Sequence, residues 1–255
     1  MEIFYSFAGL LVGFIVGLTG IGGGALMTPI LIMVFGIPPI VAVSTDLLYA
    51  SITKCGGMMS YAKQKLVDWR VAMVLLAGSI PGSLITLRFM SGLEDLGQVE
   101  QLINLMLGVS LILTSIAVFL RDKIRNVTAN RALVSGVPLT GLTILIGLFL
   151  GGMVTLSSVG AGALGTALLI VFYPRMPMAM IIGTDLVHAV VLTGVAAVGH
   201  YQMDNVNFEL LQFLLIGGIP GALAGSYLGT RLSPNIMQPI MGALLLIIGL
   251  RFMVA

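Results

Sequence analysis

Apolar runs of about twenty residues recur along the whole chain, separated by short polar segments. When helical, runs of that length match the hydrocarbon core of a bilayer. Only 9% of the 255 residues are charged, against roughly 25% in soluble domains, and the mean hydropathy is +1.11. The pattern predicts an all-α, polytopic inner-membrane protein with about 8–10 transmembrane segments.

The chain repeats itself at an offset of about 138–139 residues. "GIGGGAL" from Gly20 is matched by "SVGAGAL" from Ser158, and "VSTDLLYA" from Val43 by "IGTDLVHA" from Ile182. "GSIPGS" is likewise matched by "GGIPGA". Two homologous halves are a common transporter plan. The predicted units are a first transmembrane repeat at 1–121, a charged connector at 122–137 and a second transmembrane repeat at 138–255.

Each half opens with a glycine-interrupted apolar segment, 2–36 and 139–173. A straight helix of that length would measure about 52 Å, against a hydrocarbon core of about 30 Å. Two shorter helices that enter and return would relate the halves as inverted repeats, whereas one tilted, broken crossing would make them parallel. Both alternatives stay open. Three further helices are predicted in each half, at about 40–61, 71–90 and 102–120, and at about 178–201, 210–228 and 236–254.

Basic residues gather in two segments, 63–70 and 121–131. Two crossings separate them in either topology, so both segments are expected on one side of the membrane. By the positive-inside rule that side is cytoplasmic. The helical-hairpin alternative then places both termini outside, and the single-crossing alternative places both inside.

The glycine-rich breaks predict a central binding site. Irregular backbone survives in hydrocarbon only where protein buries it or a watery cavity borders it. Helices that begin near Ala25 and Ala163 would aim free N–H groups and positive dipole ends at an anion. The alternative is close helix packing through small residues. The predicted substrate-binding residues are Gly20, Gly22, Gly24, Thr28, Lys54, Ser157, Ser158, Gly160 and Gly162.

Asp46, Lys54 and Asp185 fall inside predicted membrane helices, where charges are expensive and typically functional. A stripe of polar and small residues from Asp46 to Tyr61 is expected to face inward, and the apolar side, with Leu47, to face lipid. Lys54 lies roughly 12 Å along the axis from Asp46, too far for a direct ion pair. Each charge therefore needs a partner on another helix, water or a substrate.

Asp46, Asp185 and His188 are the predicted coupling or gating residues. Each Asp follows a Thr near a predicted helix start, so capping of free N–H groups is an open alternative. His188 has the alternative of being a hydrogen-bonded core histidine. Lys54 is expected to meet a substrate or a carboxylate, with snorkelling to the interface as the alternative. His200, at a predicted helix end, is expected at the membrane interface.

In these motifs the chain resembles the TauE/SafE family of sulfite and organosulfonate exporters. "GLTGIGGGALMTPIL", "STDLLYASITK", "GSIPG" and their second-half counterparts carry the resemblance, which covers nearly the whole chain. The resemblance implies a secondary transporter of small anions, often sulfur oxyanions or carbon–sulfur compounds. Many members have Gly-Thr-Ser where this chain has Asp46 and Asp185 after threonine, so the chain looks like a branch of the family.

The sequence thus predicts a secondary active transporter of sulfite, a sulfonate or a related sulfur-containing anion, working by alternating access with a proton or sodium as coupling ion. No cofactor is expected, and the net charge of +2 gives no nucleic-acid footprint. Whether two copies form a homodimer stays open. One alternative is an anion channel or structural membrane subunit. Another is an intramembrane hydrolase using Ser157 or Ser158 with His188 and Asp185. The chain lacks a G-x-S-x-G elbow, so it is not expected to be an enzyme.

Overall fold

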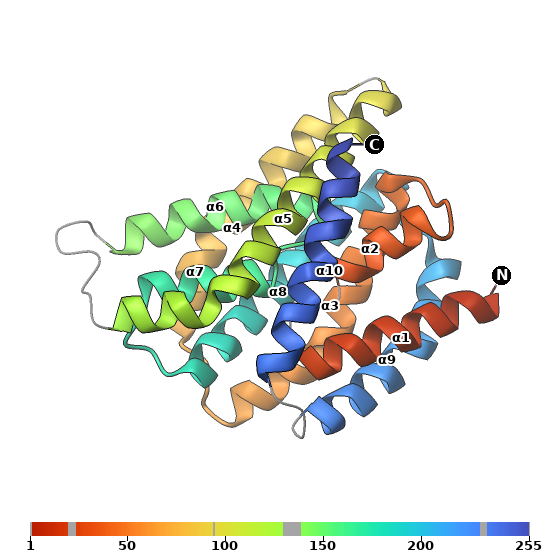
Figure 1. Cartoon of the computed structure of the whole chain (residues 1–255). Helices are drawn as coiled ribbons and strands as arrows, with labels where there is room; N and C mark the ends of the chain where they lie inside the picture. Colours follow the sequence, from red (N-terminus) through yellow and green to blue (C-terminus); the bar gives the residue numbers. More distant parts are fainter. Residues whose placement is uncertain (1, 20–23, 94, 130–138, 230–233, 255) are drawn as a thin grey trace.

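The computed structural model describes residues 2–19, 24–93, 95–129, 139–229 and 234–254. This part of the chain forms ten α-helices and no strand, as predicted (Figure 1). The first half contains α1 (Glu2–Thr19), α2 (Gly24–Met33), α3 (Pro39–Lys63), α4 (Trp69–Ser91) and α5 (Leu96–Ala129). The second half contains α6 (Leu139–Ser157), α7 (Ala163–Phe172), α8 (Met178–Gln202), α9 (Phe208–Gly229) and α10 (Pro234–Val254).

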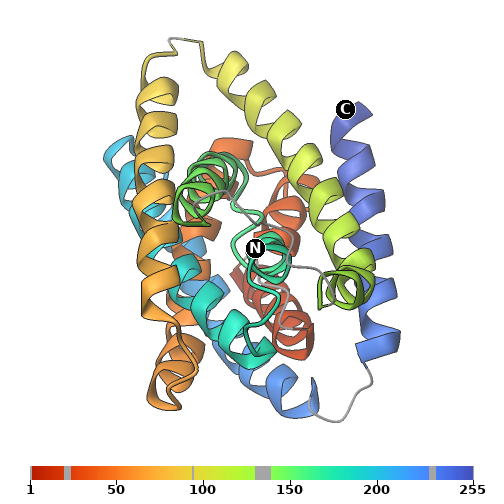
Figure 2. The ribbon, with the colours of Figure 1, turned by 90° about the vertical axis from the view of Figure 1, so that its left-hand side faces the viewer.

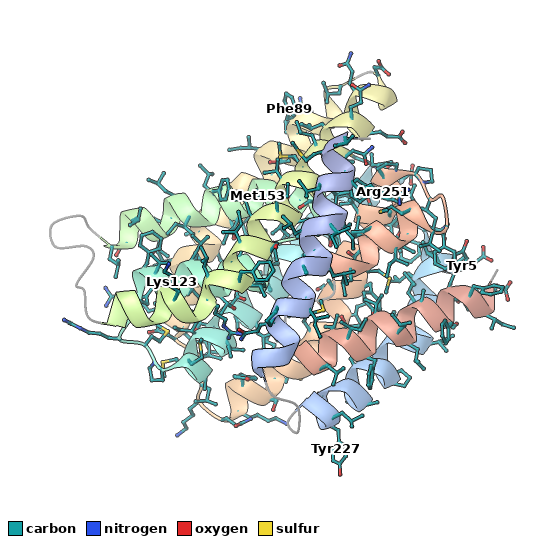
Figure 3. All side chains as sticks on the ribbon, viewed as in Figure 1. Tyr5, Phe89, Lys123, Met153, Tyr227 and Arg251 are labelled. Carbon is teal, nitrogen blue, oxygen red and sulfur yellow. The ribbon has the colours of Figure 1, made fainter. Side chains whose placement is uncertain are left out.

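Five helices, α4, α5, α6, α8 and α9, include a stretch long and apolar enough to cross a membrane. The described parts of α1, α7 and α10 contribute shorter apolar stretches. Large apolar and aromatic side chains such as Phe89 and Tyr227 project outward from the bundle (Figure 3). An outer surface of this kind suits hydrocarbon rather than water. The number of segments that cross the bilayer stays a prediction.

Each glycine-interrupted segment is a pair of helices, α1 with α2 and α6 with α7. In the second break Ser158, Gly160 and Gly162 have φ values of 56°, 110° and 145°. Such left-handed backbone suits glycine, which has no Cβ to clash with its own carbonyl. The left-handed backbone begins at Ser158, directly after α6, and the two glycines let the next helix begin at Ala163, as the sequence predicts. The first break, at 20–23, lies outside the described residues.

The two halves make equivalent contacts with each other: a loop residue of each half bonds to the threonine of the Thr-Asp motif in the other half. The backbone N–H of Asp68 donates to Thr184 Oγ1 at 2.9 Å, and that of Asn207 donates to Thr45 Oγ1 at 3.1 Å. The side chains of Asp68 and Asn207 also accept a hydrogen bond from the first turns of α4 and α9, at 3.1 and 2.9 Å. Both pairs match through the repeat offset. The halves are therefore related by an approximate two-fold exchange.

Equivalent helices of the two halves run antiparallel. In the α3–α8 pair, Ser44 contacts His200 while Ser51 contacts Val190, so the residue numbers run in opposite directions. α5 and α10 pack in the same antiparallel manner along one side of the bundle, and α4 lies along the opposite side (Figure 2). A two-fold axis that exchanges antiparallel helices is perpendicular to them. This is the internal relation that inverted repeats require.

The described parts of the two basic segments lie at one end of the bundle, as predicted. The α3–α4 loop meets the start of α8 through Asp68 and Thr184, and Arg121 contacts Met178 there at 3.9 Å. α1 packs parallel to α9, whose start lies at the opposite end. α1 with α2 and α6 with α7 thus enter from opposite ends and turn back at their breaks. The helix directions favour the hairpin alternative, while the inverted topology across a bilayer stays a prediction.

Backbone contacts between glycines hold two helix pairs together, α1 with α9 and α4 with α6. A Cβ added at Gly217 would overlap the backbone of Ser6, and one added at Gly13 would overlap Gly218. Apolar side chains gain nothing by leaving lipid for each other, so close backbone approach supplies the packing energy. The small residues of the "GSIPG" and "GGIPG" motifs are therefore packing residues.

Two expectations about individual residues and helix bounds need correction. The helix predicted at about 102–120 is longer, because α5 spans Leu96–Ala129 and includes the first residues of the predicted connector, whose remainder lies outside the described residues. Leu47 is fully buried rather than lipid-facing. The reason is that α2, α8 and α9 surround the N-terminal half of α3, which leaves it no lipid face.

Candidate functional site

Two equivalent Thr–Asp pairs lie where the short helices meet the central pair α3–α8. On α2, Thr28 Oγ1 donates to Asp46 Oδ2 at 2.6 Å. On α7, Thr166 Oγ1 donates to Asp185 Oδ2 at 2.9 Å. Both carboxylates are buried. Since α3 begins at Pro39 and α8 at Met178, both carboxylates lie well inside their helices, so the capping alternative is wrong.

Lys54 joins the two halves at the second break. Its Nζ donates to the carbonyl oxygen of Ala161, between α6 and α7, at 2.6 Å. The side chain is 9% exposed, so it does not snorkel to an interface. Asp46 and Asp185 both interact electrostatically with its ammonium group. The lysine therefore meets a backbone carbonyl directly, with a carboxylate from each half nearby.

Several polar atoms around Lys54 are buried without a hydrogen-bond partner in the described part of the chain. They are Oδ1 of Asp46, Oδ1 of Asp185, Oγ of Ser158 and Nδ1 of His188. Ser158 lies beside Asp46, and the Asp185 carboxylate lies against the backbone of Gly165. Unpaired polar atoms are costly away from water. A cluster of them beside a buried cation can bind a small polar ligand or a proton.

Gly165 tests how much the site depends on the position of the Asp185 carboxylate. A Cβ at this position would overlap that carboxylate. In Gly165→Ala we therefore expect the side chain of Asp185 to turn away and the anion transport predicted from the sequence to fall at least about tenfold, because 1 Å of misplacement costs on that scale or more. The initial rate of sulfite uptake into liposomes that contain the purified protein measures the effect. Gly56→Ala is the control, since a Cβ added there meets no atom within 4 Å.

His188 and Ser157 have partners that do not fit the hydrolase alternative. His188 Nε2 hydrogen bonds to Ser79 Oγ at 3.0 Å. Ser157 Oγ donates to the carbonyl of Met153 at 2.7 Å and lies 3.0 Å from Ser110 Oγ. A nucleophile and its base must share a hydrogen bond, and these residues bond to other partners. In the described structure His188 is a core histidine that keeps one ring nitrogen open beside Lys54.

The expectation that His200 lies at the membrane interface is wrong. The residue is fully buried, with Nδ1 2.8 Å from Ser44 Oγ and Nε2 donating to the Thr155 carbonyl at 3.0 Å. The N-terminal half of α3 and the end of α6 cover it. The position of His200 near a helix end does not predict this burial. The residues that cover it come from the other half and from 45 positions upstream.

The predicted glycines of the breaks divide into two groups. Gly24 is the first residue of α2, and Gly160 and Gly162 lie in the second break. Gly20 and Gly22 lie outside the described residues. Whether any of these glycines touches a substrate stays a prediction.

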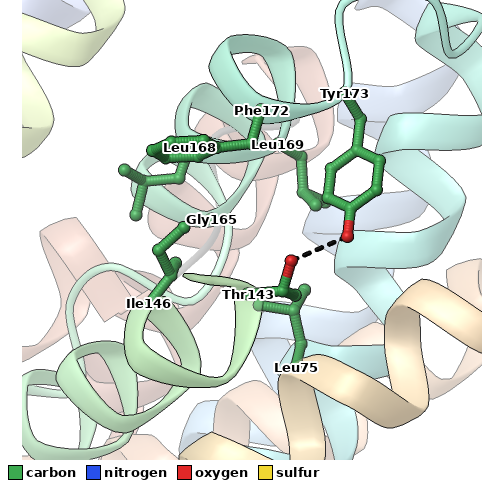
Figure 4. Close-up of a pocket in the computed structure, with 8 residues that line it drawn as sticks. All are labelled: Leu75, Thr143, Ile146, Gly165, Leu168, Leu169, Phe172 and Tyr173. Atoms are coloured by element: carbon green, nitrogen blue, oxygen red, sulfur yellow. Dashed lines mark hydrogen bonds between the residues drawn. The ribbon is translucent and has the colours of Figure 1, made fainter. Parts of the chain in front are cut away.

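A small pocket lies beside α7 (Figure 4). Thr143 and Tyr173 close it with a hydrogen bond of 2.7 Å between their hydroxyls. Gly165 both lines this pocket and touches the Asp185 carboxylate, whereas Lys54 is not among its lining residues. The lining residues are Leu75, Thr143, Ile146, Gly165, Leu168, Leu169, Phe172 and Tyr173.

Comparison with known proteins gives matches over almost the whole chain. The family described as "Sulfite exporter TauE/SafE" matches residues 5–252. The chain is 39% identical to the probable membrane transporter protein YjnA of Bacillus subtilis (strain 168), with 98% of this chain and 99% of that protein covered. It is 26% identical to the probable membrane transporter protein YunE of the same strain, covering 94% and 93%. It is 28% identical to a probable membrane transporter protein of Xylella fastidiosa (strain Temecula1 / ATCC 700964), covering 89% and 85%. No solved structure matches.

The family match begins in α1 and ends in α10, so it includes both halves, both breaks and both Thr–Asp pairs. It confirms the resemblance that the glycine-rich and Thr-Asp motifs indicate. The family is described as one of exporters and the named relatives as probable membrane transporter proteins, and neither description is that of an enzyme class. The chain therefore belongs to the TauE/SafE family of membrane transporters.

Proposed function

We propose that this transporter is a secondary active carrier of a small anion, sulfite or a sulfonate, in the cell's inner membrane. It works by alternating access, and a proton rather than sodium drives it. The anion binds midway through the bundle, between the two breaks. Lys54 and the N-termini of α2 and α7 supply the positive potential, and Asp46, Asp185 and His188 handle the proton.

The observation that carries this proposal is the buried ammonium group of Lys54. A lysine has three N–H donors, and in the described part of the chain one of them reaches the Ala161 carbonyl. Buried cations inside membranes are expensive and mark substrate or ion pathways. A sulfur oxyanion carries several strong acceptor oxygens, so it can take the remaining donors together with backbone N–H groups at the helix starts.

The architecture supports alternating access. α1 with α2 and α6 with α7 enter the bundle from opposite ends, and each turns back at its break. The two halves repeat the same contacts, so an arrangement open at one end has a counterpart of similar energy open at the other. Exchanging the packing of the halves would move access from one side of Lys54 to the other. In such a transport cycle the described structure, in which the residues around Lys54 are buried, corresponds to an occluded conformation.

Purified protein in liposomes tests the proposal. We expect saturable sulfite uptake, faster with a pH gradient, and counterflow that a channel cannot produce. Flux that never saturates and shows no counterflow would assign the protein to the channel alternative. Absence of sulfite and sulfonate flux under every gradient would contradict the proposed function.

A further inference from the structure

We propose that each monovalent anion enters the site together with one proton, which one of the two Thr–Asp pairs takes up. This inference rests on the proposed function and deepens it, because it makes proton coupling a consequence of the charges around Lys54. The Thr–Asp pairs are Thr28 with Asp46 and Thr166 with Asp185.

The charges near Lys54 do not favour an anion by themselves. The ammonium group contributes +1 and the two carboxylates contribute −1 each, so the empty cluster has a net charge of about −1 when all three are ionised. A monovalent anion would bring it to about −2 in a buried place, where water screens little. One proton on either carboxylate returns the occupied cluster to the charge of the empty one. The anion therefore binds well only with its proton.

The structure contains an oxygen atom for that proton in each half. In each pair the threonine hydroxyl occupies Oδ2, and Oδ1 has no hydrogen-bond partner in the described residues. A protonated carboxyl group keeps the bond to threonine through one oxygen and gains an O–H at the other. That O–H can donate to an oxygen of the anion. The proton would therefore neutralise the carboxylate and help hold the substrate.

Few other titratable groups face the pairs. α3 contributes Lys54 and Tyr49, and α8 contributes His188, which keeps Nδ1 open near Lys54. Among the described residues, the packed helices α2, α4, α5, α6, α7 and α9 bury hydroxyls and glycines and no charged side chain. The hydroxyls that lie against the pairs or His188 are Thr28, Ser79, Ser158 and Thr166. A proton on His188 would place a second positive charge beside the Lys54 ammonium group, which the repulsion between the two charges opposes. The two carboxylates are therefore the groups that take up the proton.

Methanesulfonate is a suitable probe, because it stays a monovalent anion at every pH used. Its Kd is measured on the solubilised full-length protein from pH 5.5 to 8, in sodium and in choline buffers. We expect the Kd to rise about tenfold per pH unit on the alkaline side, the signature of one proton taken up on binding. Asp46→Asn and Asp185→Asn imitate the protonated carboxyl group. Each should make binding independent of pH, and either variant suffices if the other fails to fold.

The matched control is Asp68→Asn, which removes the same charge at the start of α4. Asn207 already caps α9 at the equivalent position, so the variant should fold and keep the pH dependence of the wild type. Binding that does not change with pH in the wild type would overturn the inference while leaving anion transport standing. A methanesulfonate Kd that differs between the sodium and choline buffers at constant pH would also overturn it. Absence of binding by methanesulfonate and by sulfite at every pH would contradict the proposed function itself.

Discussion

Replacement of Lys54 by methionine is expected to lower sulfite uptake about 100-fold or more. Methionine keeps much of the buried stem but removes the ammonium group. An anion would then face Asp46 and Asp185 without a compensating charge. Losing one charge-assisted hydrogen bond costs about 1.5–3 kcal/mol, and about 2.7 kcal/mol corresponds to 100-fold in affinity. Initial uptake rates in liposomes, at matched protein content, measure the effect.

Two variants separate this effect from misfolding. Thr193, the counterpart of Lys54 in the second half, bonds the Ala189 carbonyl at 2.8 Å, so Thr193→Val should keep transport within about twofold, a loss of at most about 0.4 kcal/mol. In the double variant Lys54→Met, Asp185→Asn the net charge of the cluster is again about −1, which should restore folding but not transport. Full uptake by a folded Lys54→Met protein would remove this residue from the binding site.

Substitution of Gly217 by alanine is the second change with a large expected effect. A Cβ there would overlap the Ser6 carbonyl and lie 2.7 Å from the backbone nitrogen of Leu10. Backbone atoms cannot turn aside as a side chain can, so α1 and α9 must separate along their length. We expect a loss of about 3 kcal/mol or more of stability, at the upper end for overpacked sites. Thermal unfolding in detergent and the monodisperse yield measure it.

Gly56→Ala is the matched control, because an added Cβ at Gly56 meets no atom within 4 Å. Removing a glycine from the interior of α3 should raise stability by about 0.5–1 kcal/mol. If the alanine variants at Gly217 and Gly56 unfold at the same temperature, backbone contact between α1 and α9 does not hold the bundle together.

The order of the helices and most of their bounds, those of α5 excepted, were accessible from the sequence, because apolar length, repeat offset and glycine breaks are local signals. The second break shows this well, since Gly160 and Gly162 adopt backbone that other residues avoid.

The partners inside the bundle were not accessible in the same way. Periodicity tells which residues share a face of a helix but not what another helix places opposite them. The sequence therefore leaves open what Asp46 contacts, and its partner, Thr28, lies on a neighbouring helix. The burial of His200 and the bond from Lys54 to Ala161 depend on contacts between the halves. Such contacts leave no trace in a single sequence.

The central claim is that the anion binds beside Lys54, between the two breaks. Selenite has the shape and charge of sulfite, and its selenium atom can be located by anomalous diffraction. In crystals soaked with selenite, the account predicts a selenium peak within hydrogen-bond distance of Lys54 Nζ, lost in the Lys54→Met variant. A peak found only elsewhere, or unchanged in that variant, would contradict it.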